Sequence, residues 1–176
     1  MSGLILPFRG VMPVIHPSAF IAPTATVIGN VTIGPEASVW FGCTLRADMS
    51  SIEIGARTNI QDHTVVHLAS DVPTRIGSDV SVGHRCILHA CTVGNRVLVG
   101  MGSILMDGAV VGEDSVVGAG SLLSRGKIFP PGSLILGNPA RVLRPLTEEE
   151  KAGIAELARK YVDVKNNYLH QEKTQT

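Results

Sequence analysis

Aromatic side chains are scarce in this sequence, because Phe, Trp and Tyr together make up 4% of its 176 residues. The core must therefore be filled mainly by small and β-branched side chains. An excess of charge of either sign is also missing, since 15 Lys and Arg balance 15 Asp and Glu. We accordingly predict neither a nucleic-acid partner nor an anionic membrane surface as a partner.

Long apolar runs are absent as well. No window approaches the roughly 18 apolar residues of a membrane span, and the opening M-S-G-L-I-L-P-F-R-G lacks the charged-then-apolar layout of a secretory signal. Cysteine is limited to three residues, an odd number that suits a reducing compartment better than a disulfide framework. These absences predict a soluble cytoplasmic protein, and the length fits one domain with an appendage.

The sequence contains instead a six-residue repeat. From Ile15 to Leu45, and again from Val93 to Ile135, an aliphatic residue recurs every six positions. Gly or Pro repeatedly falls one or two places after the aliphatic, so the period is neither helical nor a plain alternation, and it indicates short strands joined by turns. The steps that depart from six are Leu45 to Ile54 (nine), Val66 to Ile76 (ten) and Val82 to Ile87 (five).

A hexapeptide repeat of this kind indicates a β-helix, in which stacked units build a continuous core. The pattern resembles the left-handed β-helix proteins, whose hexapeptides each form one side of a triangular prism. The resemblance implies an all-β solenoid, a left-handed parallel β-helix over residues 15–140, after a lead-in strand at 1–14. The capping-box sequence from Thr147 to Glu150 and the apolar spacing beyond it predict one C-terminal α-helix over 147–170, packed along the prism.

Three histidines, His67, His84 and His89, lie within one short segment. Three imidazoles are the ligand count of a catalytic zinc site, which keeps one coordination position open. Counting prism sides from Leu45 puts His67 and His89 on the same side in successive coils, and His84 on the preceding side. A prism packed against copies of itself around a threefold axis would bring these sides together, so we predict a cyclic trimer whose metal sites lie between chains.

Four strings of residues carry a more specific resemblance: L-R-A-D (45–48), T-N-I-Q-D (58–62), V-V-H (65–67) and V-G-H-R-C-I-L-H (82–89). In this order on hexapeptide repeats they resemble the γ-class carbonic anhydrase family, particularly its YrdA-type bacterial members. The resemblance implies a homotrimer that binds a divalent metal, zinc or iron, through His67, His84 and His89, with His84 contributed across the interface. It also implies the chemistry, in which metal-bound hydroxide attacks CO2, the small-molecule substrate, to give bicarbonate.

The resemblance assigns roles to further residues as well. Gln61 resembles the residue that hydrogen-bonds the metal-bound water, Asn59 lies in the same motif, and Tyr161 resembles a tyrosine of the terminal helix that approaches the site. Arg46 and Asp48 resemble an interfacial salt-bridge pair, and Asp62 belongs to the motif of Gln61. The count of sides independently places Arg46 and Asp48 one coil before His67, and Gln61 and Asp62 one coil before His84, where residues that orient ligands are expected.

The sequence departs from the archetypal family pattern in its acidic residues. Met49 follows Asp48 where the archetype has a glutamate, and the short 69–75 excursion carries one acid, Asp71. Without an acidic proton shuttle, CO2 hydration is expected to be slow or absent. The departure keeps open a non-catalytic, metal-stabilised assembly protein as an alternative.

Two further alternatives are weighed on the residues. A hexapeptide acyltransferase or thioester hydrolase acting on a CoA-linked substrate is disfavoured, because such transferases commonly use a lone histidine and no long loop is available to form a pocket. Cys86 and Cys91 alternate with His84 and His89 as in a mixed Cys/His zinc site. Both cysteines, however, fall four places after a side-starting aliphatic, the small inward position, so we predict free core thiols.

Overall fold

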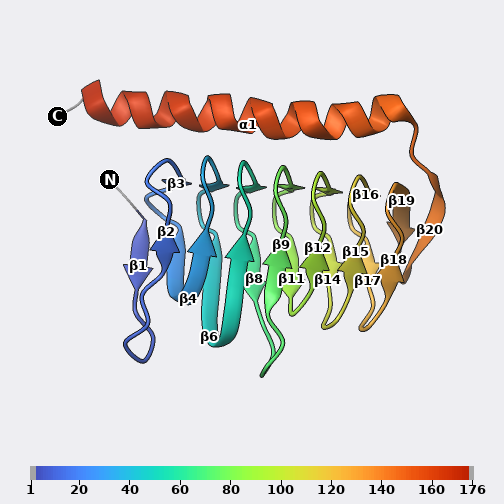
Figure 1. The fold of residues 1–176 in the computed structure, drawn as a ribbon, viewed down its shortest axis with the longest axis horizontal. Coiled ribbons are helices and arrows are strands. Elements are labelled where there is room, and N and C mark those ends of the chain that lie inside the picture. Colours follow the sequence, from blue (N-terminus) through green and yellow to red (C-terminus); the bar gives the residue numbers. More distant parts are fainter. Residues whose placement is uncertain (1–2, 175–176) are drawn as a thin grey trace.

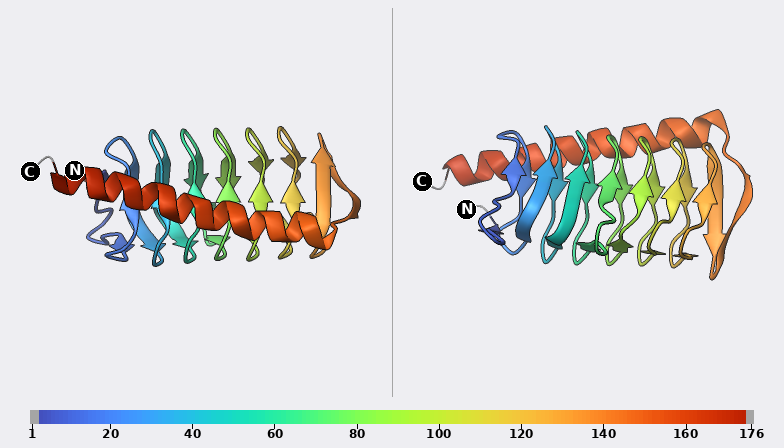
Figure 2. Two further views of the ribbon diagram at one scale, coloured as in Figure 1. Left: turned by 90° about the horizontal axis from the view of Figure 1, so that it is seen from above. Right: turned by 60° about the horizontal axis from the view of Figure 1, so that its bottom comes forward.

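The computed structural model describes residues 3–174, with side chains to residue 170. It is a parallel β-solenoid of about seven turns with a single helix lying along it (Figure 1). This arrangement confirms the predicted fold class. The two further views in Figure 2 agree that the helix runs along the length of the prism.

The strands form three sides, named here by the count of sides from Leu45. The first side comprises the start of β6 (Thr44–Ile54), then β8 (Val65–His67), β11 (Ile87–His89), β14 (Ile104–Leu105) and β17 (Leu122–Leu123). The second comprises the end of β6, then β9 (Thr74–Ile76), β12 (Thr92–Val93), β15 (Val110–Val111) and β18 (Ile128–Phe129). The third comprises β3 (Phe20–Ile21), β5 (Ser38–Val39), β7 (Asn59–Ile60), β10 (Ser81–Val82), β13 (Leu98–Val99), β16 (Val116–Val117) and β19 (Ser133–Gly137).

Both ends of the prism are covered by additional strands. At the N-terminal end, β1 (Leu4–Leu6) and β2 (Val14–Ile15) pair in parallel with β4 (Thr26–Ile33), which in turn pairs with β6. At the other end, β20 (Ala140–Pro145) pairs antiparallel with β19. The antiparallel strand ends the parallel stacking and leads the chain into the helix (Figure 1).

One aliphatic residue per side points into the prism, and these residues stack in register from coil to coil. On the first side the fully buried stack includes Leu45, Val66 and Leu88. Ile87, taken from the sequence as the inward residue, is 42% exposed, so that assignment was wrong. Neighbouring residues of a strand point to opposite faces, and in this Ile-Leu pair the second residue points inward. The step of six therefore continues through Leu88, and the short step of five falls between Leu88 and Val93.

The corner between the second and third sides carries a column of charged residues with left-handed backbone geometry. Their φ angles lie near 55° from Glu36 through Arg57 and Asp79 to Arg96 and Asp114. Arg57 donates to both carboxylate oxygens of Asp79 at 2.6 and 2.7 Å. Arg96 bonds Asp114 in the same way at 2.6 and 2.9 Å. Charge alternation down this corner thus links successive coils.

The helix α1 (Glu148–Thr174) begins with the predicted capping box. The Thr147 N–H donates to the Glu150 carboxylate at 2.9 Å, and the Glu150 N–H donates to the Thr147 hydroxyl at 3.2 Å. Among the described residues no helix has both the length and the apolar character needed to cross a membrane. The helix packs on the third side through buried Ile154 and Ala158, and the rings of Tyr161 and Tyr168 lie against Trp40.

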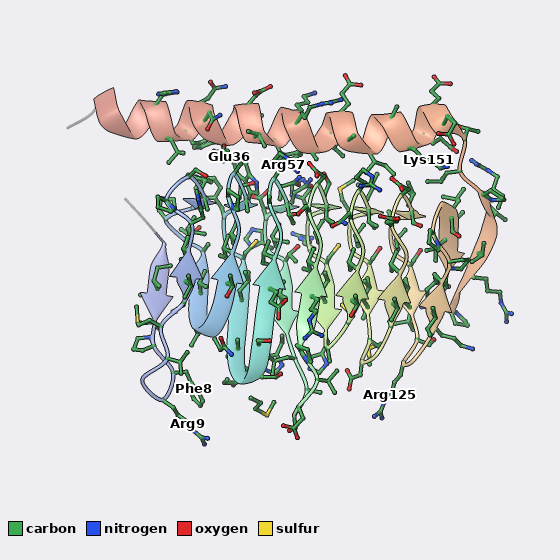
Figure 3. The ribbon with its side chains drawn as sticks, viewed as in Figure 1. Phe8, Arg9, Glu36, Arg57, Arg125 and Lys151 are labelled. Atoms are coloured by element: carbon green, nitrogen blue, oxygen red, sulfur yellow. The ribbon has the colours of Figure 1, made fainter. Side chains whose placement is uncertain are left out.

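One charged side chain of the helix is buried, which the sequence did not reveal. Lys165 is 1% exposed and forms an ion pair with Glu36 at 2.7 Å. Glu36 lies directly beneath the helix in Figure 3. The pair ties the C-terminal half of the helix to the N-terminal coils.

Candidate functional site

His67 and His89 stand side by side on the first side. They are directly opposite each other in the parallel pairing of β8 with β11, and their ring centroids are 5.2 Å apart. Successive coils lie at the inter-strand spacing of about 4.8 Å, so the register alone brings the two imidazoles together. The structure thus brings these two histidines into contact, as expected from the count of sides.

Each histidine of this pair has an aspartate carboxylate within hydrogen-bonding distance of one ring nitrogen, in the neighbouring coil on the side away from the other histidine. Oδ1 of Asp48 lies 3.1 Å from Nε2 of His67, and Arg46 forms an ion pair with the other oxygen of Asp48. Oδ1 of Asp107 lies 2.5 Å from Nδ1 of His89. Asp48, His67, His89 and Asp107 therefore form a continuous row along the prism axis, called the acid–histidine column below.

The electrostatics of the column favour ionised carboxylates. Partial burial raises the pKa of Asp48, but hydrogen bonds with His67 and Arg46 outweigh it, so the net pKa is below the ordinary value. The hydrogen bond from His89 lowers the pKa of Asp107, against a smaller opposing effect of burial. Both acids are therefore charged at neutral pH and can each hold one ring nitrogen of a histidine.

His84 lies away from the column, in the turn between β10 and β11. Its Nδ1 lies 2.8 Å from Oδ2 of Asp62, and its side chain is 42% exposed. Because His84 precedes β11 and His89 ends it, the two lie at opposite edges of the first side. Among the side chains described up to residue 170, no group of three or more His, Cys, Asp or Glu could hold one metal ion. The three histidines of one chain therefore fall into two separate groups, called partial sites below: the acid–histidine column, and His84 with Asp62.

A buried chain of amides lies next to His84. Nε2 of Gln61 donates to Oδ1 of Asn59 at 3.0 Å, and Nδ2 of Asn59 donates to the hydroxyl of Ser81 at 2.8 Å. Gln61 is 6% exposed, and Asn59 and Ser81 are fully buried. One of the two N–H groups of Gln61 is thereby used, which orients the amide and leaves its carbonyl oxygen available to accept a hydrogen bond.

Tyr161 reaches the same region from the helix. It lines a crevice of about 310 Å³ between α1 and the third side, together with Gln61 and His84. Burial raises the pKa of the Tyr161 hydroxyl, and the charge of Asp62 raises it further. The rest of the crevice is predominantly apolar, and its lining residues include Leu98, Val99, Met101, Ala119 and Leu157.

The cysteines take no part in either partial site. Cys86 and Cys91 are each 1% exposed and free, as predicted for core thiols. Burial raises the pKa of Cys86 to about 11 and that of Cys91 to about 12. Both thiols belong to the hydrophobic core of the prism, whereas the three histidines are partly exposed on its surface, which argues against a mixed Cys/His site.

The donor chemistry of the histidines fits a divalent metal. Each of the three imidazoles has one ring nitrogen beside a carboxylate, which leaves the other ring nitrogen available to coordinate a metal. Carboxylate-backed histidines are the usual ligands of zinc and of similar divalent metals. Two of these donors share the acid–histidine column, and the third lies at the other edge of the first side.

Sequence reasoning missed two residues of this arrangement, Asp107 and Ser81. Asp107 follows inward-facing Leu105 by two residues, one coil beyond His89, so extending the count of sides by one coil would have found it. Ser81 lies opposite Asn59 in the pairing of β7 with β10. The same register argument that paired the histidines would have placed it beside Asn59.

Comparison with known proteins gives a consistent set of relatives. Residues 90–125 match the family described as Bacterial transferase hexapeptide (six repeats). The Carbonic anhydrase of Geobacillus kaustophilus is 45% identical over 173 residues, which cover 97% of this chain and 95% of that protein. Gamma carbonic anhydrase 2, mitochondrial, of Arabidopsis thaliana is 44% identical over 158 residues, or 86% of this chain, but the match spans only 57% of that protein.

A solved structure is similar over nearly the whole chain. The crystal structure of a hexapeptide transferase family protein from Anaplasma phagocytophilum superimposes with a TM-score of 0.91 at 50% sequence identity. The superposition covers 94% of this chain and 98% of the other.

Proposed function

Since the chain belongs to the γ carbonic anhydrase family, we propose that it is a metal-dependent carbonic anhydrase that interconverts CO2 and bicarbonate. The observation that carries the proposal is the acid–histidine column on one edge of the first side, with His84 on the other edge. His67, His84 and His89 are the proposed ligands of the metal, zinc or iron.

We propose that the complete site forms between copies of the chain in a cyclic homotrimer. His67 and His89 of one subunit would meet His84 of the partner subunit, because packing copies around a threefold axis can bring opposite edges of the first side together. An exposed apolar row between these edges supports this contact surface. Val65 and Ile87 are 41% and 42% exposed, and Ile104 and Leu122 continue the row.

A bound divalent metal would supply a water whose pKa falls to about 7, and with it a nucleophile at neutral pH. The residues of the chain would orient the reactants. Gln61, held by Asn59, presents its carbonyl oxygen as an acceptor for an O–H group. Tyr161, whose raised pKa keeps its hydroxyl protonated, is proposed as a hydrogen-bond donor from the crevice.

Further acidic and basic residues would tune this site. Asp48 and Asp62 would hold the ring orientation of His67 and His84, and Arg46 would offset the charge of Asp48. The excursion next to the column carries a single acid, Asp71, in contrast to an acidic loop. We therefore expect proton release to limit the rate of CO2 hydration.

Subunit complementation tests the shared site directly. The His67→Ala and His84→Ala variants are each expected to lose bound metal and CO2 hydration, measured by elemental analysis and stopped-flow. When the two variants are co-expressed with different tags and mixed trimers are isolated, one intact site forms in each trimer, so partial activity returns. If mixed trimers stay inactive, or if a monomer binds metal stoichiometrically, the shared site is wrong.

The crevice beside Tyr161 favours a second candidate function, hydrolysis of an acyl thioester of CoA. One of the two sequence arguments against it, besides the set of three histidines, was the lack of a long loop, but the helix α1 provides a wall for the crevice in place of such a loop. A volume of about 310 Å³ is at the lower end of small-molecule pockets and exceeds the needs of CO2, which is on the order of two liquid waters in size. In this reaction the oxygen of water adds to the acyl carbon, the C–S bond breaks, and a carboxylate, a thiol and a proton are released.

Activity on acetyl-CoA and butyryl-CoA, followed by thiol release, would test this candidate. Ala119→Phe narrows the crevice and is expected to lower the butyryl-to-acetyl rate ratio by about fivefold or more, whereas Ala152→Phe, at an exposed alanine of α1 outside the crevice, leaves the ratio unchanged. Thiol release no faster than in buffer without protein would eliminate the thioesterase. Bound metal without either activity would support the assembly protein instead.

A further inference from the structure

Asp107 has a specific bond to His89 that neither the motifs nor the resemblance assign. We infer that Asp107 is a positioning residue that fixes the ring orientation and proton position of His89 for metal binding. The inference rests on the proposed function, because it presumes that His89 is a ligand. It concerns the chain's own residues and can be tested without measuring activity.

The geometry determines which nitrogen of His89 is available. The distance of 2.5 Å between Nδ1 of His89 and Oδ1 of Asp107 is that of a short, charge-assisted hydrogen bond. An ionised carboxylate can only accept, so Nδ1 must carry the proton. In a neutral imidazole Nε2 is then the nitrogen without a proton, and that nitrogen can bind a metal.

Asp107 differs from the other acid of the column in having a single partner. Asp48 is shared between His67 and Arg46, so part of its charge is offset by the guanidinium. Among the described residues, His89 provides the one side-chain hydrogen bond or ion pair of Asp107. Arg125, at the corner opposite the helix in Figure 3, affects it only through its charge. The carboxylate of Asp107 is therefore not shared with a guanidinium group and is directed at His89.

The alternative explanation is that Asp107 merely serves the tight turn in which it lies. The next residue, Gly108, has a φ of 68°, and aspartate is common in such turns. The turn is nevertheless closed by backbone, because the Ala109 N–H donates to the Met106 carbonyl at 2.9 Å. The carboxylate instead reaches back one coil to His89, so the turn does not account for the direction of the side chain.

Metal affinity is the deciding measurement. Zinc binding by wild type, Asp107→Asn and Asp107→Ala would be measured by competition with a chelator of known affinity. Loss of a carboxylate partner of a metal-binding histidine typically weakens metal affinity by about 10–100-fold, and we expect this for Asp107→Ala. Asp107→Asn keeps an acceptor oxygen next to Nδ1, so its loss should be clearly smaller. If the residue only filled space, the isosteric Asp107→Asn variant would instead keep the full wild-type affinity, so an intermediate loss marks the role of the carboxylate charge.

Two control variants distinguish failure of the positioning role of Asp107 from failure of its premise, that His89 binds the metal. Asp114→Asn removes a carboxylate that pairs with Arg96 at another corner, and it should leave zinc affinity unchanged. His89→Ala should lose the metal. Zinc affinity of Asp107→Ala within about twofold of wild type, with loss in His89→Ala, would overturn the positioning role. If His89→Ala also keeps its metal, the proposed ligand set fails instead.

A second readout covers the case in which Asp107→Ala does not fold. In ¹⁵N-histidine-labelled metal-free protein, the Nδ1–H of His89 should give a strongly downfield proton signal that shifts upfield in Asp107→Asn. The same signal should be unchanged in Asp114→Asn. An Nδ1–H signal identical in wild type and Asp107→Asn would show that the carboxylate does not hold this proton, and would overturn the inference.

Discussion

The coils from residue 44 to 92 and those from 93 to 137 share one core but differ on their surface. In the later coils the aliphatic step is six throughout and each strand on the first two sides has two residues. The earlier coils contain all the departures from six, the long strand β6 and the excursion at Ala69–Val72. They also hold every proposed metal ligand and the amides of Asn59 and Gln61. The coils with regular spacing therefore serve mainly as scaffold, with Asp107 as the residue that reaches from them to the site, and the coils with irregular spacing carry the proposed ligands.

The physical reason is that inward residues constrain the repeat while outward residues do not. A buried aliphatic must meet its equivalents in the coils above and below, so its step can change only where a loop absorbs the difference. Outward positions are free to carry histidines and carboxylates, and the fixed register then sets the distances between them. His67 and His89 show this, because their pairing follows from the buried stack of Val66 on Leu88.

The largest contrast between the two regions should appear on substituting a buried polar residue in each. Gln61→Leu removes the proposed acceptor oxygen while keeping similar volume. We expect kcat/KM for CO2 hydration, which does not depend on proton release, to fall by about 10²–10³-fold, as on loss of one positioned hydrogen bond at a reacting group, with metal content unchanged. Ser133→Ala, which removes a buried hydroxyl bonded to the Pro130 carbonyl in the regular coils, should leave kcat/KM within about twofold. Equal effects of the two substitutions would refute the division into scaffold and site.

The reverse contrast is expected for stability. Leu105 is fully buried in the regular coils, and Leu105→Ala should lower the free energy of unfolding by about 2–5 kcal/mol through lost burial and a cavity. Leu143→Ala, at a site that is 63% exposed on β20, should change it by less than about 0.5 kcal/mol. Urea denaturation at one fixed protein concentration measures both. A cost below about 1 kcal/mol for Leu105→Ala would show that the regular coils do not provide the core stability assigned to them.

Much of this contrast was predictable because the aliphatic period reports buried stacking directly. The period predicted the solenoid, the capping box predicted the start of the helix, and the count of sides predicted that His67 lies beside His89. Where two aliphatic residues are adjacent, the period does not show which of them points inward, and the prediction of Ile87 in place of Leu88 was therefore wrong. Asp107 was missed because a single acid in a turn has no periodic signature of its own.

Long-range contacts of the helix were also beyond the sequence. The apolar spacing of α1 predicts which of its faces packs on the prism, but not how far along the prism each turn lies. Lys165 occurs in a polar stretch and looks like a solvent-exposed residue of the helix. Its burial depends on the ion pair with Glu36, which lies more than a hundred residues earlier in the sequence. No local sequence pattern predicts this contact.

The smallest predicted effect concerns this anchor, which holds the helix near the first coils. Hydrogen bonds from Lys165 and Ser18 lower the pKa of Glu36 in the folded protein below its ordinary value. A carboxyl whose folded pKa is depressed stabilises the fold above its unfolded pKa, near 4.5, and that contribution is lost as the pH falls through the lower folded value. The stability difference between wild type and Glu36→Gln should therefore be constant from pH 7 to about 5 and narrow below pH 4.5.

The expected magnitude is less than about 1 kcal/mol, because the Glu36 side chain is 37% exposed and solvent screens the pair. Urea midpoints measured at pH 7, 5, 4 and 3 would follow this stability difference. The matched control is Glu156→Gln, at an exposed acid of α1. A gap that widens toward low pH would mean that Glu36 is held protonated in the fold, contrary to the ion pair. Metal content should be the same in both variants, because this anchor lies outside the coils that carry the histidines.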